Sequence, residues 1–351
     1  MTPSLYGITH SNRNFSDPFY WGKNQFNSSF PVALACYMRD KKIPAVYIRH
    51  GQKSDTYISE ISFDDVFGTD LPNEKLFFAF EERFQPFTCF VEDTVKAIDL
   101  VIIETDSKVF IRPLEIKLTT LPDDLTSGGD EADYGSEIVI RSPTMRYMAM
   151  SMAQSCKEEI HDIRRIFESV FTKIRNLENL HEALKFRDKI MIALEVFLNR
   201  YAHHEKPLLM QPIWKTQGKQ PLLAQNCLDI FVWSDFALSR LFMDVAHSSD
   251  ERISRPQRSA LRLARFLYEL SRGGKVYQQP IYDGMTYDTL NDKEFAVSGK
   301  KTNSYMKCSR LLKPIIEKTE IKNLILGGGQ KHLSPERRFD AILYFAKDLF
   351  Q

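Results

Sequence analysis

The chain has 351 residues, of which 43% are hydrophobic, and a formal net charge of +1, so it can bury a substantial core in one large domain or two small ones. No segment approaches the roughly 20 consecutive apolar residues that span a bilayer, and the first residues do not form a signal peptide, so we expect a cytoplasmic protein without a membrane partner. Five widely spaced cysteines without a CxxC pair predict free thiols in a reducing cytosol, and we expect no zinc site.

The N-terminal part of the chain predicts an irregular polar arm followed by regular elements. We expect a helix over 32–40, a strand over 45–49 and a helix over 71–84 whose ends are set by prolines. Glu81 and Glu82 lie near the end of this last helix. They either belong to a solvated helix face or offer an additional carboxylate for a second metal ion beside the segment that follows.

Two apolar, β-branched segments, 97–103 and 109–118, predict a β-hairpin with a polar turn between them. Each segment carries charge that a buried strand would normally lack, because an unpaired buried carboxylate is costly. If the hairpin is centred on Ser107, Asp99 lies directly across from Glu115. The two carboxylates are then predicted to converge on one patch of the sheet.

Lys117 is predicted to join this patch, because side chains two residues apart on a strand share a face. Hard cations such as Mg²⁺ bind carboxylate oxygens, carbonyls and waters, so Asp99, Glu115 and the Ile116 carbonyl are candidate metal ligands. A metal there would polarise a phosphate and acidify a bound water, while Lys117 would orient that water and offset developing negative charge. The alternative is a surface hairpin with a cross-strand salt bridge, which the apolar character of both strands disfavours.

Beyond the hairpin, residues 119–137 form an acidic, turn-rich segment that is long enough to be a functional flap. A stripe of methionines within 142–160 predicts core packing. The remaining expected elements are a strand over 137–141, helices over 142–160, 160–171 and 177–186, a helix or a strand over 189–197, a strand over 227–233 and a helix over 236–243.

The C-terminal third is locally basic, with twelve Lys or Arg against six Asp or Glu over 251–310. A helix from Arg255 through Leu270 is predicted to carry Arg258, Arg262 and Arg265 on one stripe. We expect this stripe to contact DNA phosphates, with a merely solvated basic face as the alternative.

Two polar loops are candidates for reading base edges in the major groove, where Lys pairs with guanine and Asn with adenine. Neither loop has the apolar periodicity of a core element. The candidate residues are Lys300, Lys301 and Asn303 in one loop and Lys23, Asn24 and Gln25 in the other.

The spacing of Asp99 and Glu115-Ile116-Lys117 resembles the Asp, spacer, Glu-x-Lys pattern of the PD-(D/E)xK nuclease superfamily, with Ile98 where that pattern often has proline. Longer stretches resemble the HindVP family of type II restriction endonucleases over most of the chain. These stretches are 21–31, 114–124 and 134–141.

The resemblance implies an α/β fold with a mixed sheet, in which an αβββαβ restriction-endonuclease-like core carries N- and C-terminal elaborations. It also implies Mg²⁺-dependent cleavage of double-stranded DNA at a short palindrome, with GRCGYC as the expected target. In a prokaryotic cytoplasm such an enzyme is paired with a cognate DNA methyltransferase. A palindrome presents two equivalent strands, so we expect a homodimer.

We expect three regions within one compact unit: an N-terminal arm and decoration over 1–70, a nuclease core over 71–245 and a basic DNA-binding region over 246–351. Two other functions stay open. One is a repair or junction-resolving nuclease that cuts by DNA structure, and the other is a non-catalytic DNA-binding protein with a nuclease-like core.

One further group of residues can bind metals. His203 and His204 precede Glu205, and imidazole and carboxylate are both metal ligands. Adjacent residues seldom share a face, so we interpret these residues as a surface turn before Pro207.

Overall fold

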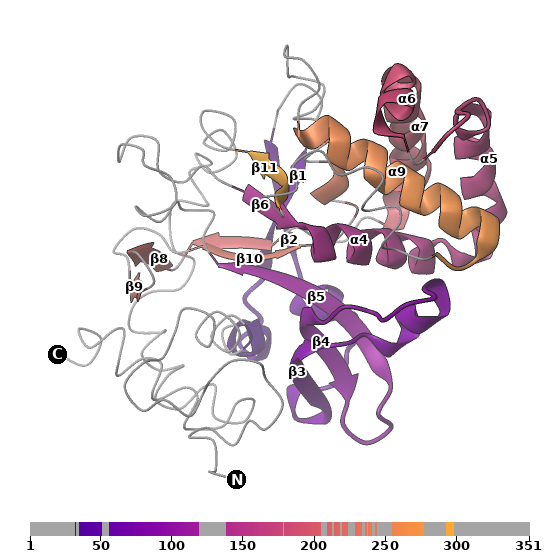
Figure 1. Ribbon diagram of the computed structural model, residues 1–351. Helices are drawn as coiled ribbons and strands as arrows, with labels where there is room; N and C mark the ends of the chain where they lie inside the picture. The colour runs from indigo at the N-terminus through magenta and orange to yellow at the C-terminus, as the bar shows by residue number, and fades with distance from the viewer. Residues whose placement is uncertain are drawn as a thin grey trace, which may run out of the picture.

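The computed structural model describes residues 32, 35–50, 56–118, 138–177, 179–204, 209–212, 214–217, 220–223, 229–233, 236, 238–240, 243, 255–276 and 293–297 (Figure 1). Its largest sheet has seven strands in the order β2-β1-β7-β10-β5-β4-β3. The strands are β1 (Ala45–His50), β2 (Thr56–Ile61), β3 (Leu76–Glu82), β4 (Ile98–Glu104), β5 (Phe110–Leu118), β7 (Leu209–Pro212) and β10 (Asp229–Trp233).

The described architecture confirms an α/β protein, but the expected mixed sheet is wrong for the described strands. All neighbouring strands of the large sheet are antiparallel. The strand expected over 137–141 is present as β6 (Ile138–Arg141), yet it pairs with β11 (Lys293–Val297) in a separate two-stranded sheet. Another small sheet joins β8 (Trp214–Gln217) and β9 (Gln220–Leu223).

Most helices expected after the hairpin are confirmed, and the undecided segment over 189–197 is helical. The helices are α4 (Ser142–Ser155), α5 (Ile160–Phe171), α6 (Leu180–Lys185), α7 (Arg187–Arg200) and α9 (Arg255–Gly273). Figure 1 shows them grouped to one side of β3, β4 and β5. Shorter helical elements are α2 (Phe63–Phe67), η2 (Asn73–Lys75), η3 (Gln85–Phe90), η5 (Lys157–Glu159) and η6 (Ala202–His204).

The helix expected over 71–84 is wrong, because this segment forms η2 and then strand β3. Leu76 and Phe78 are buried while Phe77 is 56% exposed, which is the alternation of a strand with one face on the core. The strand pairs along its length with β4, from Leu76 opposite Glu104 to Glu82 opposite Ile98. Pairing with β4, and not the local periodicity of the sequence, therefore determines that this segment is a strand.

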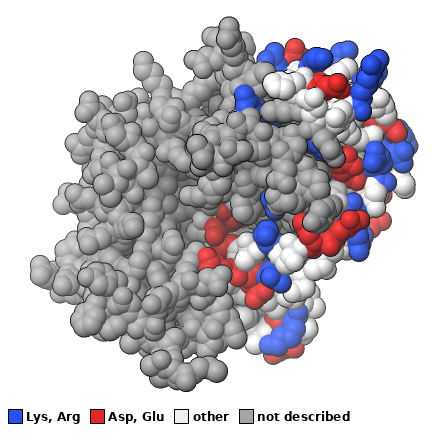
Figure 2. All heavy atoms as spheres, viewed as in Figure 1, with Lys and Arg blue, Asp and Glu red and all other residues white. Residues whose placement is uncertain are grey.

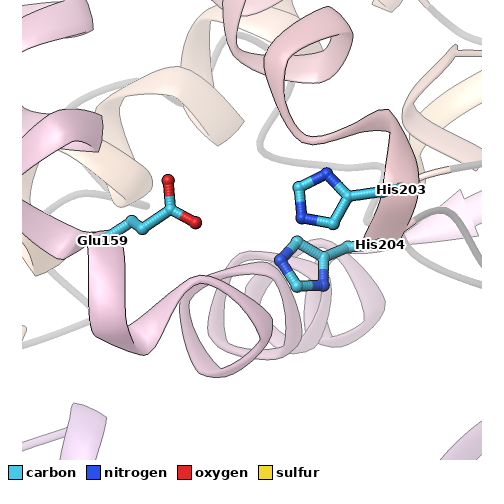
Figure 3. Close-up of side chains that lie close together, drawn as sticks. All are labelled: Glu159, His203 and His204. Carbon is cyan, nitrogen blue, oxygen red and sulfur yellow. The ribbon is translucent and has the colours of Figure 1, made fainter.

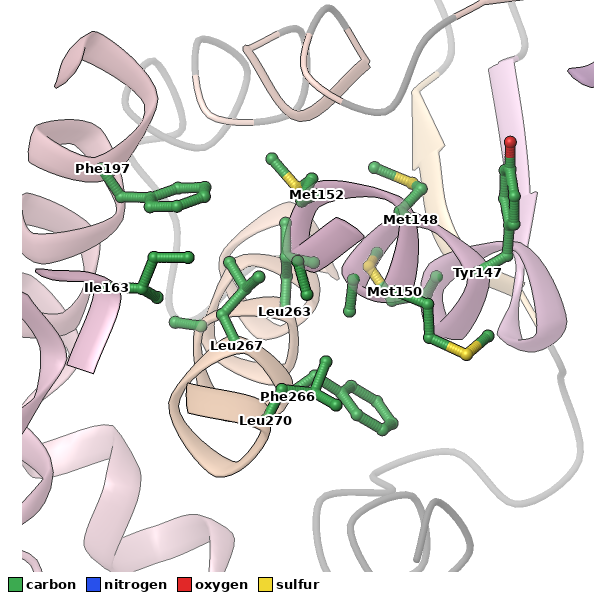
Figure 4. Close-up of a cluster of buried hydrophobic side chains, with 14 of the residues drawn as sticks. Tyr147, Met148, Met150, Met152, Ile163, Phe197, Leu263, Phe266, Leu267 and Leu270 are labelled. Atoms are coloured by element: carbon green, nitrogen blue, oxygen red, sulfur yellow. The ribbon is translucent and has the colours of Figure 1, made fainter. Parts of the chain in front are cut away.

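The hydrophobic core lies where α4 packs against α9. The methionines expected in the core, Met145, Met148, Met150 and Met152, are all buried, and Figure 4 shows three of them beside the leucines of α9. Helix α9 is enclosed on almost every side from Gln257 to Ser271. A helix with burial on all faces belongs to the interior and not to a surface.

A contact between β5 and α2 fixes the outer part of the hairpin. Arg112 on β5 donates from Nη1 to the carbonyl oxygens of Asp65 and Val66. Helix α2 ends at Gly68, whose φ of 75° lies in the left-handed region. The backbone angle favours glycine, and a Cβ at this position would lie 2.8 Å from the Arg112 guanidinium carbon, so that side chain would have to shift.

Candidate active site

Over 100–102 the β4–β5 hairpin has the register that its sequence predicts, and the register shifts between Ile102 and Ile103, nearer the turn. Leu100 lies opposite Leu114, and Val101 lies opposite Pro113. The next step along this register brings Asp99 across from Glu115. We refer to Asp99 and Glu115 together as the acidic patch.

The Asp99 side chain reaches across the hairpin. Its Oδ2 accepts a hydrogen bond of 2.9 Å from the backbone N–H of Ile116. A carboxylate has two oxygens with about four lone-pair sites, so a carboxylate can accept hydrogen bonds and bind a metal ion at the same time. The hydrogen bond fixes the carboxylate against the residue that follows Glu115.

Glu115 is 7% exposed and lies on a strand with neighbours on both sides, since Trp233 of β10 is its register partner. Its Oε1 accepts a hydrogen bond of 2.9 Å from the Thr144 hydroxyl in the first turn of α4. A buried carboxylate needs hydrogen bonds, a counter-charge or a metal to offset its lost hydration, and Thr144 supplies one of these bonds.

Thr144 is a functional candidate that the sequence reasoning missed. Ser142-Pro143 predicts the start of the helix correctly, but its approach to Glu115 depends on how α4 packs on the sheet. Tyr147, one turn later, donates from its hydroxyl to the Pro113 carbonyl at 2.9 Å. Two hydroxyls from one helix therefore fix β5 on either side of Leu114.

Lys117 lies on β5 opposite Phe231 of β10, but its side chain is outside the described part of the structure. The ladder places Lys117 two residues after Glu115, on the same face of the strand. Its contact with the acidic patch stays a prediction.

Glu81 and Glu82 lie on a strand instead of a helix, at the end of the sheet where Asp99 lies. Glu82 is opposite Ile98, and Phe80 is opposite Leu100. Glu81 has a φ of 52°, in the left-handed region that residues other than glycine seldom adopt. Glu82 accepts from the Arg83 backbone N–H through Oε1.

The expected exposed basic stripe on α9 is wrong for two of its three arginines. Arg262 is 2% exposed and Arg265 is also buried, because neighbouring elements enclose this helix. Arg265 donates to the Leu177 carbonyl, and Arg258 is half-buried. Direct phosphate contact by Arg262 is therefore not supported in this conformation.

The candidate base-reading residues Lys23, Asn24, Gln25, Lys300, Lys301 and Asn303 lie outside the described residues. Within the described part of the face in Figure 2, acidic and basic side chains are interspersed instead of forming one broad basic surface. None of the described helices is long and apolar enough to cross a membrane.

The sequence matches the HindVP restriction endonuclease family over residues 21–350. The chain belongs to that family, and it is an enzyme of the site-specific deoxyribonuclease class. It is 39% identical over 350 residues to the type II restriction enzyme HgiDI of Herpetosiphon aurantiacus, covering 99% of this chain and 97% of that protein. It is 40% identical over 351 residues to the probable type II restriction enzyme HindVP of Haemophilus influenzae, covering 99% of this chain and 95% of that protein. No solved structure matches the chain.

Proposed function

We propose that this enzyme hydrolyses phosphodiester bonds of double-stranded DNA at a short palindrome in a Mg²⁺-dependent reaction, with GRCGYC as the expected target. The acidic patch is the proposed metal site, and β3, β4, β5 and α4 are the proposed parts of a PD-(D/E)xK core. The observation that carries the proposal is the Asp99 carboxylate bound to the N–H of Ile116, directly beside the buried Glu115.

The residues present fit a hard divalent cation. Asp99, Glu115 and the Ile116 carbonyl would hold the ion through oxygen atoms, the donors that Mg²⁺ prefers. A bound Mg²⁺ polarises a phosphate and lowers the pKa of its water. Glu81 and Glu82, at the end of β3 that pairs with the start of β4, are the proposed additional acids.

The protein groups around the acidic patch have separate proposed roles. The Ile116 N–H orients Asp99, and the Thr144 hydroxyl orients Glu115. Lys117 is proposed to orient the attacking water and to stabilise the negative charge that develops on the phosphate. Orientation by hydrogen bonds of this kind reduces the reorganisation needed when the substrate binds.

The substrate implies further features of the proposal. Two equivalent strands of a palindrome require two active sites related by a two-fold axis, so we propose a homodimer. Host DNA with the same site has to be protected, which implies a cognate methyltransferase. Phosphate contact by Arg258, and base contacts by the two polar loops, stay proposals about DNA binding.

The experiment is digestion of a plasmid that contains GRCGYC sites, with Mg²⁺ and then with EDTA. Discrete fragments at the mapped sites, present only with Mg²⁺, would support the proposal. Cleavage confined to branched or mismatched substrates would identify a structure-specific nuclease instead. Specific binding without cleavage under any divalent ion would identify a non-catalytic DNA-binding protein.

A further inference from the structure

A second group of metal-binding side chains lies in the helical layer. Glu159, His203 and His204 each present a ligand atom, and these atoms all lie within 4.8 Å of one another. Figure 3 shows the Glu159 carboxylate extended toward the two imidazoles. We refer to these three residues as the histidine cluster.

The surface turn expected at His203 and His204 is confirmed, but the expectation that the two side chains diverge is wrong. They lie in η6, directly after α7, and their ring centroids are 4.1 Å apart. His204 is half-buried, with its ring 6.2 Å from that of Phe236, whereas His203 is exposed. The third ligand of the group is Glu159, at the end of η5.

The backbone under the histidine cluster is fixed by contacts that do not involve its ligands. Arg200 at the end of α7 forms an ion pair with Asp162 in the first turn of α5, which begins directly after Glu159. Arg240 donates to the Asn199 side chain and to the Leu198 carbonyl at the same end of α7. The segments that carry the three ligands are therefore held together without a metal.

A buried hydroxyl lies in the same region. Tyr201 is fully buried, its ring centroid lies 6.2 Å from that of His204, and its hydroxyl has no hydrogen-bond partner in the described structure. Burial first, and then the charge of Glu159, raise the pKa of Tyr201 to about 12. An unsatisfied buried hydroxyl is unusual in a protein core, since such groups normally bind a polar partner.

We propose that the histidine cluster binds a first-row transition metal ion, with Zn²⁺ as the principal candidate. Two imidazoles and one carboxylate form a zinc donor set that leaves a fourth position for water, and Mg²⁺ is disfavoured because it prefers oxygen donors. A zinc–nitrogen bond of about 2.0–2.1 Å places donors of a tetrahedral site roughly 3.3 Å apart. The ligands must close by about 1.5 Å at most, which the exposed side chains of Glu159 and His203 can do by rotamer changes.

The binding site would connect η5 to η6. A bound ion would therefore cross-link the start of α5 to the end of α7. It is independent of the proposed catalytic role of the acidic patch. The test therefore uses the full-length Asp99→Ala chain, in which the oxygen-donor site is impaired. Zn²⁺ and Co²⁺ alone are the probes.

Three measurements are made: the number of ions bound by equilibrium dialysis, the visible absorption of bound Co²⁺, and the shift in unfolding midpoint. We expect one bound ion, a Co²⁺ spectrum typical of mixed nitrogen and oxygen ligands, and a raised unfolding midpoint. Millimolar Mg²⁺ should not displace the ion. His203→Ala and Glu159→Gln should each lower affinity at least tenfold, and the double variant should abolish binding.

The controls are Glu158→Gln and His181→Ala, which alter exposed residues of the same types outside the histidine cluster. Both should bind like the parent. His204→Ala is less informative because this ring packs near Phe236 and its loss can disturb folding. The proposal is overturned if the Asp99→Ala chain binds neither ion, or if binding survives in the His203→Ala/Glu159→Gln double variant.

Discussion

The acidic patch and the histidine cluster differ in both chemistry and construction. The patch offers oxygen donors from neighbouring strands whose register fixes them, and one carboxylate is 7% exposed. The cluster offers mainly nitrogen donors from short helical turns, with two of its three side chains exposed. Strand pairing sets donor positions within the sheet, whereas the cluster depends on how separate helices pack. The first suits a hard ion that works on phosphate, and the second suits a tightly bound transition metal.

The largest expected effect is on DNA cleavage, which should depend on the acidic patch and not on the histidine cluster. Asp99→Asn keeps an oxygen that accepts from the Ile116 N–H but removes the charge, so we expect cleavage in Mg²⁺ to fall at least 10²- to 10³-fold. Glu115→Gln should behave similarly. Initial rates on a plasmid substrate measure this loss, and DNA binding in Ca²⁺ should stay near that of the parent.

His203→Ala serves as the matched variant from the other region. It should retain the parental cleavage rate in Mg²⁺, because the histidine cluster is not part of the proposed reaction. Cleavage by Asp99→Asn at close to the parental rate would exclude the acidic patch as the catalytic centre.

The next effect tests orientation within the patch. Thr144→Val preserves the shape of the side chain but removes its hydrogen bond to Glu115, so we expect kcat to fall about 10- to 100-fold, as for other groups that orient metal ligands. Thr144→Ser should restore most of the rate because it keeps the hydroxyl. A KM change without a kcat change in the valine variant would contradict this role.

A smaller effect concerns the contribution to folding stability of the contact between α2 and β5. Gly68→Ala adds a Cβ where φ is 75° and where the Arg112 guanidinium lies 2.8 Å away, so we expect the free energy of unfolding to fall by about 1–3 kcal/mol. Gly273→Ala is the control, since its Cβ would meet nothing within 4 Å at the end of α9. Urea unfolding measures both. Equal stability of the two variants would mean that neither the positive φ nor the Arg112 contact is costly at Gly68.

The sequence predicts best where local pattern decides the structure. The hairpin register follows from centring two apolar segments on a short turn, and Leu100 lies opposite Leu114 as this centring predicts. The sequence predicts a helix where β3 lies, because the pairing of β3 with β4 is not visible in the local periodicity of 71–84. Local periodicity does not reveal strand pairing between segments that are separated in the sequence.

The same reason explains the candidate residues that the sequence misplaced or missed. The stripe of α9 arginines looks amphipathic, but elements packed around the helix bury Arg262. Thr144 meets Glu115 only through the packing of α4 on β5. The approach of Glu159 to His203 joins residues from different helical turns, which no local spacing encodes.

The smallest expected effect compares one buried tyrosine from each region. Tyr147 donates to the Pro113 carbonyl on the sheet side, while the Tyr201 hydroxyl has no partner among the described residues. Tyr147→Phe should lower the free energy of unfolding by about 1 kcal/mol. Tyr201→Phe should leave it unchanged or raise it by about 1 kcal/mol, because an unsatisfied hydroxyl is removed.

The pH dependence of stability gives Tyr201 a second readout. Its pKa of about 12 lies above the usual value near 10, so the unfolded chain loses this proton first. The resulting stabilisation is complete below about pH 10 and is lost as the pH rises through about 12. Tyr201→Phe should therefore lose less stability than the parent between these pH values in urea unfolding. If both proteins lose the same stability, the Tyr201 phenol ionises as easily in the folded chain as in the unfolded one.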